Sequence, residues 1–222
     1  MNEIKFLMTF LAFLYILNFF TNRNARKNYN KFQQYLDKRG AEGEHQVAYE
    51  LKKYICKGNL YKSVYIPIEA GRDTEIDLLL VNCYGVFVIE SKNWNGSITG
   101  KEDGDKWIFS NTLGDSFMDN PCKQNEYHLK RLKEYLDINK DTYHSIIVFG
   151  YDSTLDFYPK NNCNSVLGIK ELEKYMDSMI NKEKILSDEE IKYIDTKIKS
   201  CIDKDDKYKE KHVQRVKALR AR

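Results

Sequence analysis

The sequence predicts a mixed α/β domain, in which helices flank a mixed β-sheet, behind an N-terminal transmembrane helix. Three observations support this fold class. An uncharged apolar run, residues 6–20, lies near the start of the chain. Apolar runs of the length of a strand then alternate with stretches in which apolar residues recur at the period of a helix. Finally, the 222 residues are 42% hydrophobic and 13% aromatic, which excludes disorder as the main state and allows a sizeable core.

The apolar run is long enough to cross a bilayer. From Ile4 to Thr21 it spans 18 residues, at the short end of the roughly 17–25 that a transmembrane helix needs. A cleaved signal peptide is the alternative, but the amino end is nearly neutral and the run offers no small-residue cleavage site. We therefore expect an uncleaved anchor at residues 1–21. Bases in the juxtamembrane segment, 22–39, predict a single-pass protein of the cell membrane whose C-terminal domain faces the cytoplasm.

The net charge of +3 conceals an acidic body between two basic ends. Residues 21–39 carry +5 and residues 203–222 carry +4, so residues 40–202 carry −6. The basic ends suit the phosphates of lipid or nucleic acid, and a solvated helix face is the alternative for the C-terminal one. The five cysteines lie at least 27 residues apart without a CxxC pair, so neither a disulfide framework nor a zinc site is predicted.

The body is predicted to begin with helices and a three-stranded meander. A juxtamembrane helix is expected over residues 28–39, and Gly40 to Gly43 end it before a helix from Glu44 to Cys56. Apolar runs then predict three strands, and Pro67 favours an edge position for the first of them. These strands cover residues 64–68, 76–81 and 86–92.

A hairpin, a second pair of strands and further helices complete the predicted body. In order they are a hairpin (96–100 with 106–110), a helix (121–136), strands (145–149 and 165–167) and helices (169–180 and 188–202). Pro121 suits a first helical position, and Ser187 with Glu190 forms a capping box before the last helix. The expected division is a folded domain at residues 40–150, a C-terminal extension with helices at 151–202 and a basic tail at 203–222.

The two central strands bring charged residues together. Pairing them about the turn at residues 82–85 places Asp77 opposite Glu90, and opposed side chains lie roughly 5 Å apart on one face. Lys92, two residues beyond Glu90, shares that face. The same register puts Ile76 on the other face, and because both faces are apolar, helices should cover both.

Two interpretations fit this spacing. Two desolvated carboxylates repel each other unless a cation neutralises them, and their oxygen atoms suit Mg²⁺ or Mn²⁺. Such a metal, with Lys92, would orient and deprotonate a water molecule and stabilise a pentavalent phosphorane. The other interpretation is a structural ion-pair network at the rim of the sheet.

Four ordered motifs and single residues between them carry a resemblance. They are Gly40-Ala41-Glu42-Gly43-Glu44, Thr74-Glu75-Ile76-Asp77, residues 85–93 (GVFVIESKN), Gly96, Trp107, and Asn120-Pro121 followed by Gln124-Asn125. Over about residues 38–150 the chain resembles the nuclease-related domain (NERD) family, which is similar to the PD-(D/E)xK restriction-endonuclease-like nucleases. The resemblance implies a restriction-endonuclease-like fold and a Mg²⁺- or Mn²⁺-dependent phosphodiesterase. Thr74-Glu75 departs from the Pro-Asp of many superfamily members, but the metal chemistry does not require that proline.

The resemblance also implies roles for individual residues. The implied catalytic residues are Asp77, Glu90, Lys92, Glu44 and Gln124, and the implied metal ligands are Asp77, Glu90, Glu44 and the backbone carbonyl of Ser91. The alternative for Glu44 is a favourable interaction with the N-terminus of its helix, and the alternative for Gln124 is an ordinary exposed position. His128, one turn after Gln124, is a weaker candidate for contact with phosphate, with a surface or core position as the alternative.

The sequence therefore predicts a membrane-anchored, metal-dependent nuclease-like protein that hydrolyses phosphodiester bonds, with DNA favoured over RNA as the partner. The alternative is a catalytically inactive, membrane-tethered module on the same fold that binds nucleic acid or acts as a scaffold. Because the acidic and basic positions are all filled, the enzyme is favoured. The chain contains no GxSxG, P-loop or Rossmann motif, so serine hydrolase, NTPase and dehydrogenase functions have no support.

Overall fold

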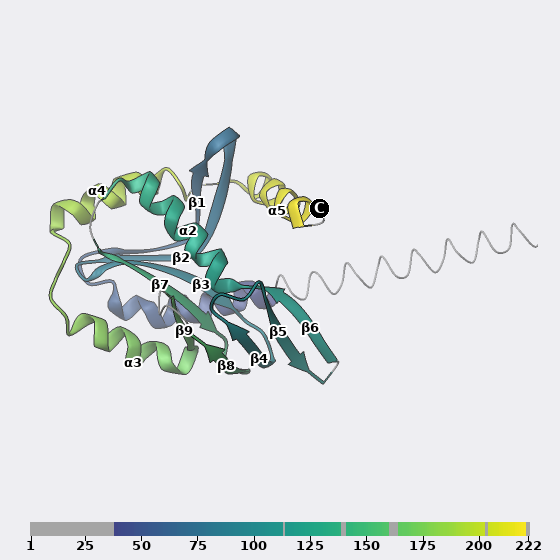
Figure 1. Cartoon of the computed structure of the whole chain (residues 1–222). Helices are drawn as coiled ribbons and strands as arrows, with labels where there is room; N and C mark the ends of the chain where they lie inside the picture. The colour runs from purple at the N-terminus through teal and green to yellow at the C-terminus, as the bar shows by residue number, and fades with distance from the viewer. Residues whose placement is uncertain (1–37, 113, 139–140, 160–163, 203, 221–222) are drawn as a thin grey trace, which may run out of the picture. The chain divides into compact units, whose positions relative to one another are not determined.

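Two β-sheets form from the central part of the chain (Figure 1). The computed structural model describes residues 38–112, 114–138, 141–159, 164–202 and 204–220. The larger sheet, in the order β1-β2-β3-β7-β9, contains β1 (Asn59–Ile68), β2 (Arg72–Asn82), β3 (Gly85–Lys92), β7 (Tyr143–Phe149) and β9 (Asn164–Gly168). The smaller sheet, in the order β6-β5-β4-β8, contains β4 (Gly96–Lys101), β5 (Lys106–Asn111), β6 (Gly114–Asp119) and β8 (Ser153–Tyr158).

Helices cover both faces of the larger sheet, as predicted. The helices of the described residues are one over residues 38–51, the short 3₁₀ helices η1 (Lys52–Tyr54) and η2 (Glu69–Gly71), α2 (Pro121–Leu136), α3 (Ile169–Ile180), α4 (Asp188–Lys199) and α5 (Asp206–Arg220). Apolar side chains of α2 and α4 pack on the face that carries Leu79 and Val88. Those of the first helix and α3 pack on the face that carries Leu78 and Phe87. The central strands are therefore buried on both sides, which explains their nearly continuous apolar sequence.

The predicted register of β2 and β3 is confirmed up to the pair Leu78 and Ile89. One prediction about the faces is wrong, because Ile76 packs in the same apolar cluster as Leu79. The alternation of β2 changes at Asp77, where the ladder with β1 omits both Asp77 and Ser63. Ser63 has a left-handed backbone with φ 48°, which interrupts the regular pleat of β1 beside Asp77.

The prediction of one mixed sheet is also wrong. The hairpin of β4 and β5 leaves the larger sheet and pairs with β6 on one side and β8 on the other. Neither β6 nor β8 has a continuous apolar run, and most side chains of β6 are exposed, so hydrophobic patterning gives little signal for them. Trp107, Ile98 and Phe149 fill the space between the two sheets.

The predicted helix break at residues 40–43 is wrong, since the helix runs without interruption over residues 38–51. Gly43 instead allows a close approach. A Cβ atom built on Gly43 would lie 2.5 Å from Cβ of Asn93, and one built on Gly150 would lie 2.3 Å from Oδ1 of the same residue. Asn93 directly follows the end of β3, so both glycines make room for the chain where it leaves that strand.

No helix of the described residues is long and apolar enough to cross a membrane. The predicted anchor, residues 1–21, lies outside the described residues, as does nearly all of the juxtamembrane helix predicted at 28–39. The helix predicted at 121–136 and the one at 169–180 have the predicted bounds. The capping box of Ser187 and Glu190 at the start of α4 is confirmed too.

The close contact at Gly43 predicts that alanine has different effects on stability at two glycine positions of one helix. Gly43→Ala should destabilise the fold by about 1 to 3 kcal/mol, because the new methyl group overlaps Asn93. Gly40→Ala adds the same methyl group where no heavy atom lies within 4 Å, and should be neutral or stabilise by up to about 1 kcal/mol through helix propensity. Urea unfolding of both variants measures the difference, and equal effects would contradict the close packing of Gly43.

Candidate active site

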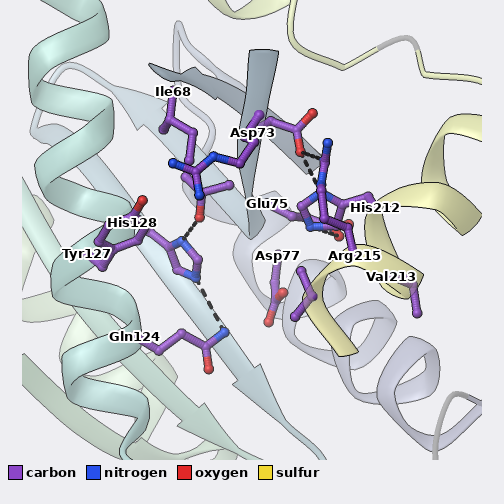
Figure 2. Close-up of a pocket in the computed structure, with 13 residues that line it drawn as sticks. Ile68, Asp73, Glu75, Asp77, Gln124, Tyr127, His128, His212, Val213 and Arg215 are labelled. Carbon is purple, nitrogen blue, oxygen red and sulfur yellow. Dashed lines mark hydrogen bonds and ion pairs between the residues drawn. The ribbon is translucent and has the colours of Figure 1, made fainter. Parts of the chain in front are cut away.

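A cavity of about 480 Å³ opens between β2, α2 and α5 (Figure 2). Asp77 of β2 and Gln124 and His128 of α2 line it, together with His212 and Arg215 of α5. Two residues that the sequence singles out, Asp77 and Gln124, therefore face one cavity. Its volume is in the range of pockets that bind small molecules and cofactors.

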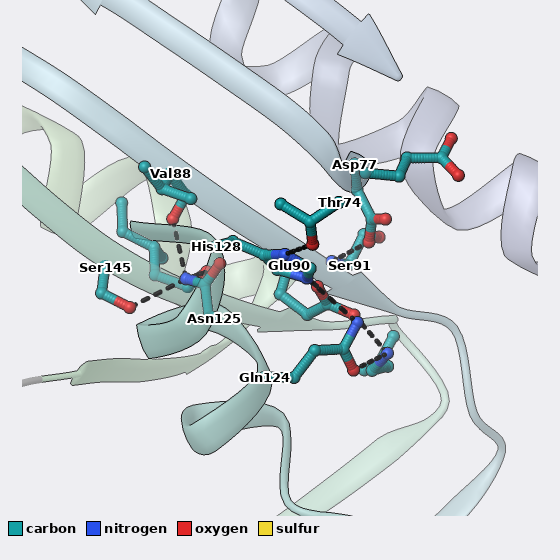
Figure 3. Close-up of polar contacts among 12 residues, drawn as sticks. Thr74, Asp77, Val88, Glu90, Ser91, Gln124, Asn125, His128 and Ser145 are labelled. Carbon is teal, nitrogen blue, oxygen red and sulfur yellow. Dashed lines mark hydrogen bonds and ion pairs between the residues drawn. The ribbon is translucent and has the colours of Figure 1, made fainter. Parts of the chain in front are cut away.

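Asp77 lies just beyond the last paired residues of β2 and β3. Its Oδ2 accepts a hydrogen bond of 2.9 Å from the backbone N–H of Ser91, so the carboxylate satisfies a donor near the end of β3 (Figure 3). Burial, followed by the negative charge of Glu90, raises the pKa of Asp77 well above its ordinary value. The folded chain alone therefore disfavours the charged form of Asp77.

Glu90, on β3, is buried and faces two basic side chains. Its Oε1 accepts a hydrogen bond from Nζ of Lys92, and its Oε2 lies 3.5 Å from Nε2 of His128. Burial would raise the pKa of Glu90, but the charge of Lys92 and the contacts with His128 outweigh it and lower that pKa. Of the two neighbouring carboxylates, Glu90 is thus the one that keeps its charge.

Lys92 connects the strand to α2. Besides Glu90, its Nζ donates a hydrogen bond of 3.3 Å to Oε1 of Gln124. The side chain of Lys92 is partly exposed, whereas that of Glu90 is buried. The structure thus brings Glu90, Lys92 and Gln124 together, and Lys92 reaches the open side of the group.

His128 has a larger part in the site than its sequence suggests. It is buried, with Nδ1 2.7 Å from Oγ1 of Thr74 and Nε2 3.3 Å from Nε2 of Gln124. Thr74 lies on β2, so His128 joins the strand of Asp77 to the carboxylate of Glu90. The available sequence signal was the four-residue spacing from Gln124, which puts both side chains on one face of the helix.

Asn125 sets the position of α2 above the sheet. Its side chain is fully buried, and its Nδ2 donates to the backbone carbonyl of Val88 at 2.9 Å and to Oγ of Ser145 at 2.8 Å. These partners belong to the neighbouring parallel strands β3 and β7. At the start of the same helix, the side chain of Asn120 accepts from the N–H of Cys122. Gln124 and His128 therefore project from a helix fixed by its own amide side chains.

Glu44 adds a third carboxyl group to the neighbourhood of Asp77 and Glu90. Burial, followed by the charges of Glu75 and Glu90, raises the pKa of Glu44 to about 7. Glu75 precedes Asp77 by two residues on β2 and is itself a hydrogen-bond acceptor for Tyr65. Neighbouring acids thus raise the pKa of Glu44 and of Asp77, which indicates a concentration of negative charge that the chain only partly neutralises.

The oxygen atoms of this site fit a divalent cation. Among the described residues, no three His, Cys, Asp or Glu side chains are grouped as a complete set of metal ligands. Glu90 Oε2 is nevertheless buried without a hydrogen-bond partner, and Asp77 lies where its charge is disfavoured. Mg²⁺ commonly binds through one or two carboxylates and takes water and substrate oxygens as its other ligands. Asp77 and Glu90 are therefore the side chains that could hold it, and ligation by these two residues, by Glu44 and by the carbonyl of Ser91 stays a prediction.

Comparison with known proteins identifies the family. The family model described as the nuclease-related domain matches residues 39–150, half of the chain. The chain therefore belongs to the nuclease-related domain family. An uncharacterized protein of Bacillus anthracis is 33% identical over 96 residues, which are 43% of this chain and 45% of that protein. The chain thus spans less than half of the length of that relative, and no solved structure matches it.

The raised pKa of Glu44 predicts how stability depends on pH. Between about pH 4.5 and pH 7 the folded chain holds a proton that the unfolded chain has lost, so this residue lowers the unfolding free energy as pH rises. The glutamine side chain of Glu44→Gln carries no charge at any pH. The fall in unfolding free energy with rising pH should therefore be about 1 to 3 kcal/mol smaller in this variant than in the parent. Urea unfolding at about pH 5 and about pH 8, without divalent cations, measures the effect.

The control for this measurement lies in the same helix. Glu50 forms an ion pair with Lys53, and Glu50→Gln should leave the decrease in stability between the two pH values as it is in the parent. If Glu44→Gln and Glu50→Gln gave the same pH dependence as the parent, Glu44 would not share the charge repulsion of the site.

Proposed function

We propose that this member of the nuclease-related domain family is a Mg²⁺- or Mn²⁺-dependent nuclease that hydrolyses phosphodiester bonds of DNA. The observation that supports it most is the position of Asp77 and Glu90 just beyond the last pair of the β2–β3 ladder, close enough that the charge of Glu90 raises the pKa of Asp77, with Lys92 bonded to Glu90. One carboxyl group is held charged and the other is disfavoured as an anion, which is a pattern that a divalent cation relieves. A purely structural ion-pair network gives no reason to place Asp77 at a cavity beside Glu90 with no ion pair of its own among the described residues.

Each residue has a distinct task in this proposal. Asp77 and Glu90 would hold the cation, which supplies charge neutralisation for the phosphodiester as it is attacked. Lys92 donates a hydrogen bond to the buried Glu90, and its own side chain is partly exposed, so its ammonium group would orient the attacking water and stabilise the charge that develops on phosphate oxygens. Gln124 positions the ammonium group of Lys92, and His128 positions the carboxylate of Glu90.

The proposal also includes the membrane. Residues 1–21 anchor the chain, and the bases of residues 22–39 keep the domain on the cytoplasmic side. The uncharged run of residues 6–20 and the basic residues after it support this part of the proposal. DNA is preferred to RNA only through the family resemblance, so both are compared below.

The nuclease function predicts a shared loss of activity in three variants. The full-length chain in mild detergent should cut linear or circular DNA with Mg²⁺ or Mn²⁺, and Asp77→Asn, Glu90→Gln and Lys92→Ala should each lower the rate by about 100-fold or more. Asp105→Asn is the control, because Asp105 is exposed and pairs with Lys123 at the hairpin turn. Circular dichroism establishes that each variant is folded.

Two results would decide against the enzyme. A parent chain that cuts neither DNA nor RNA with either metal would leave a binding or scaffolding module on the same fold. Equal activity in the parent and in Asp77→Asn would show that any cutting arises elsewhere. RNA of the same sequence, tested beside the DNA, measures the preference between the two.

The anchor predicts membrane association that depends on apolar character. The full-length chain should remain with membranes after alkaline carbonate extraction, whereas Leu11→Arg combined with Leu14→Arg should be released, because each arginine costs about 3 kcal/mol in the bilayer centre. Leu11→Ala with Leu14→Ala keeps the segment apolar and should stay with the membrane. Release of the parent itself would show that residues 1–21 do not span the bilayer.

A further inference from the structure

The C-terminal helix α5 forms part of the cavity that contains Asp77. A free helical end is one expectation for the basic tail, but α5 instead docks on Asp73 of β2, four residues from Asp77. The buried carboxylate of Asp73 accepts a hydrogen bond of 2.7 Å from Nη2 of Arg215, contacts Nδ1 of His212 and accepts from the hydroxyl of Tyr208. Polar contacts to one carboxylate therefore hold α5 beside the catalytic strand (Figure 2).

The part of the cavity farthest along β2 from Asp77 has cationic side chains. Arg72 lines it, and among the described residues its guanidinium group makes one long hydrogen bond, 3.4 Å to the carbonyl of Glu69, and no ion pair. Arg215 also lines it, is about one-third exposed, and has further N–H donors besides the one that contacts Asp73. Two guanidinium groups with spare donors suit phosphate oxygens.

An aromatic ring lies on the α2 side of the same cavity. Tyr127 lines the cavity with 39% of its surface exposed. The ring of His128 meets it edge to face at 6.3 Å, and the guanidinium carbon of Arg131 lies 5.0 Å from its centre. These contacts hold the ring while leaving surface for another flat group, and Ile68 and Val213 add apolar surface to the cavity. Stacked bases are the usual partners of such a ring in proteins that bind single strands.

We propose that this cavity is a subsite for a single polynucleotide strand, in which Tyr127 stacks on a base and Arg72 and Arg215 contact the phosphate next to the bond that is cut. The inference rests on the proposed function, because it takes Asp77 as the place of the scissile phosphate. A cavity of about 480 Å³ accepts a group of nucleotide size. Because α5 lines one side of the cavity, a duplex, which is far larger than about 480 Å³, does not fit inside it.

The charges of the cavity suit this occupant when the site holds its cation. Arg215 offsets the charge of Asp73, and Arg72 adds a positive charge that no carboxylate pairs with among the described residues. Glu75 and Asp77 remain as the negative groups at the metal end. A divalent cation there reverses the sign of that end, so the strand meets positive charge along the cavity.

Binding of short oligonucleotides tests the subsite separately from cutting. We would measure fluorescence anisotropy of the full-length chain with Ca²⁺ in place of Mg²⁺, using a labelled 12-nucleotide single-stranded DNA, the same RNA and the corresponding DNA duplex, and confirm on gels that each probe stays intact. The single strands should bind at least about tenfold more tightly than the duplex. Tyr127→Leu should weaken single-strand binding about tenfold. Arg72→Gln should weaken it and reduce its salt dependence by the equivalent of about one phosphate contact.

Matched controls come from α4, away from the cavity. Tyr193→Leu removes a partly exposed tyrosine, and Lys192→Gln removes an exposed positive charge, so both should bind the single strands as the parent does. If the duplex bound as tightly as the single strands, or if Tyr127→Leu and Arg72→Gln matched these controls, the subsite would be disproved. A parent that cuts DNA with Mg²⁺ while these variants bind normally would overturn the subsite alone, leaving the nuclease function intact.

Asp73→Ala distinguishes a wall of the subsite from a lid. Without the carboxylate that holds α5, single-strand binding should weaken, because the wall and Arg215 are displaced. Circular dichroism verifies that the rest of the chain stays folded. A gain in duplex binding and in duplex cutting, with no loss for the single strands, would mean that α5 covers the site instead of forming it, and would overturn the inference.

Discussion

The proximity of the half-buried Asp77 to the buried Glu90 is the constraint on which the rest of the site depends. Carboxylates at the end of two apolar strands lose the hydration that would separate their charges. The negative charge of only one of the two carboxylates is stabilised. Lys92 and His128 stabilise the charge of Glu90, whereas the described partner of the Asp77 carboxylate is the N–H of Ser91. Because apolar side chains fill both faces of β2 and β3, a rearrangement of these neighbours would not neutralise the remaining negative charge.

The helix α2 makes this arrangement possible. Nearby residues of this helix have different tasks. Asn125 fixes the helix to β3 and β7. Gln124 faces Lys92, and His128 faces Glu90. At the N-terminus of the same helix, Asn120 donates to the backbone of the hairpin at residues 101–104, so the smaller sheet is joined to the helix there. Buried amides with several partners are well suited to this purpose, because a displacement of the helix would leave polar groups unsatisfied.

Much of this could be predicted from the sequence because the signals were local. The strands of Asp77 and Glu90, their register and the bounds of α2 follow from apolar runs and from the proline at position 121. The second sheet could not be predicted in that way, since β6 and β8 are largely exposed and their pairing is long-range. The change of face at Asp77 depends on the backbone of Ser63, and the docking of α5 on Asp73 joins residues 142 positions apart, so neither has a periodic signature.

The two ends of the cavity differ in how firmly the fold holds them, and this difference bears on function. Asp77 directly follows the buried, paired residues of β2 and accepts a hydrogen bond from the N–H of Ser91, so the sheet itself sets its position before any ligand arrives. The α5 wall is held by polar contacts to Asp73, by the approach of His212 to Glu75 and by the packing of Tyr208 and His212 on Tyr65, and these contacts lie outside the apolar clusters of the two sheet faces. In the proposed nuclease, rigid positioning would suit the end where phosphodiester geometry decides the rate, since small displacements there are costly. A wall held by side-chain contacts outside the core would suit the other end, where the proposed single strand has to enter, stack and leave within each turnover.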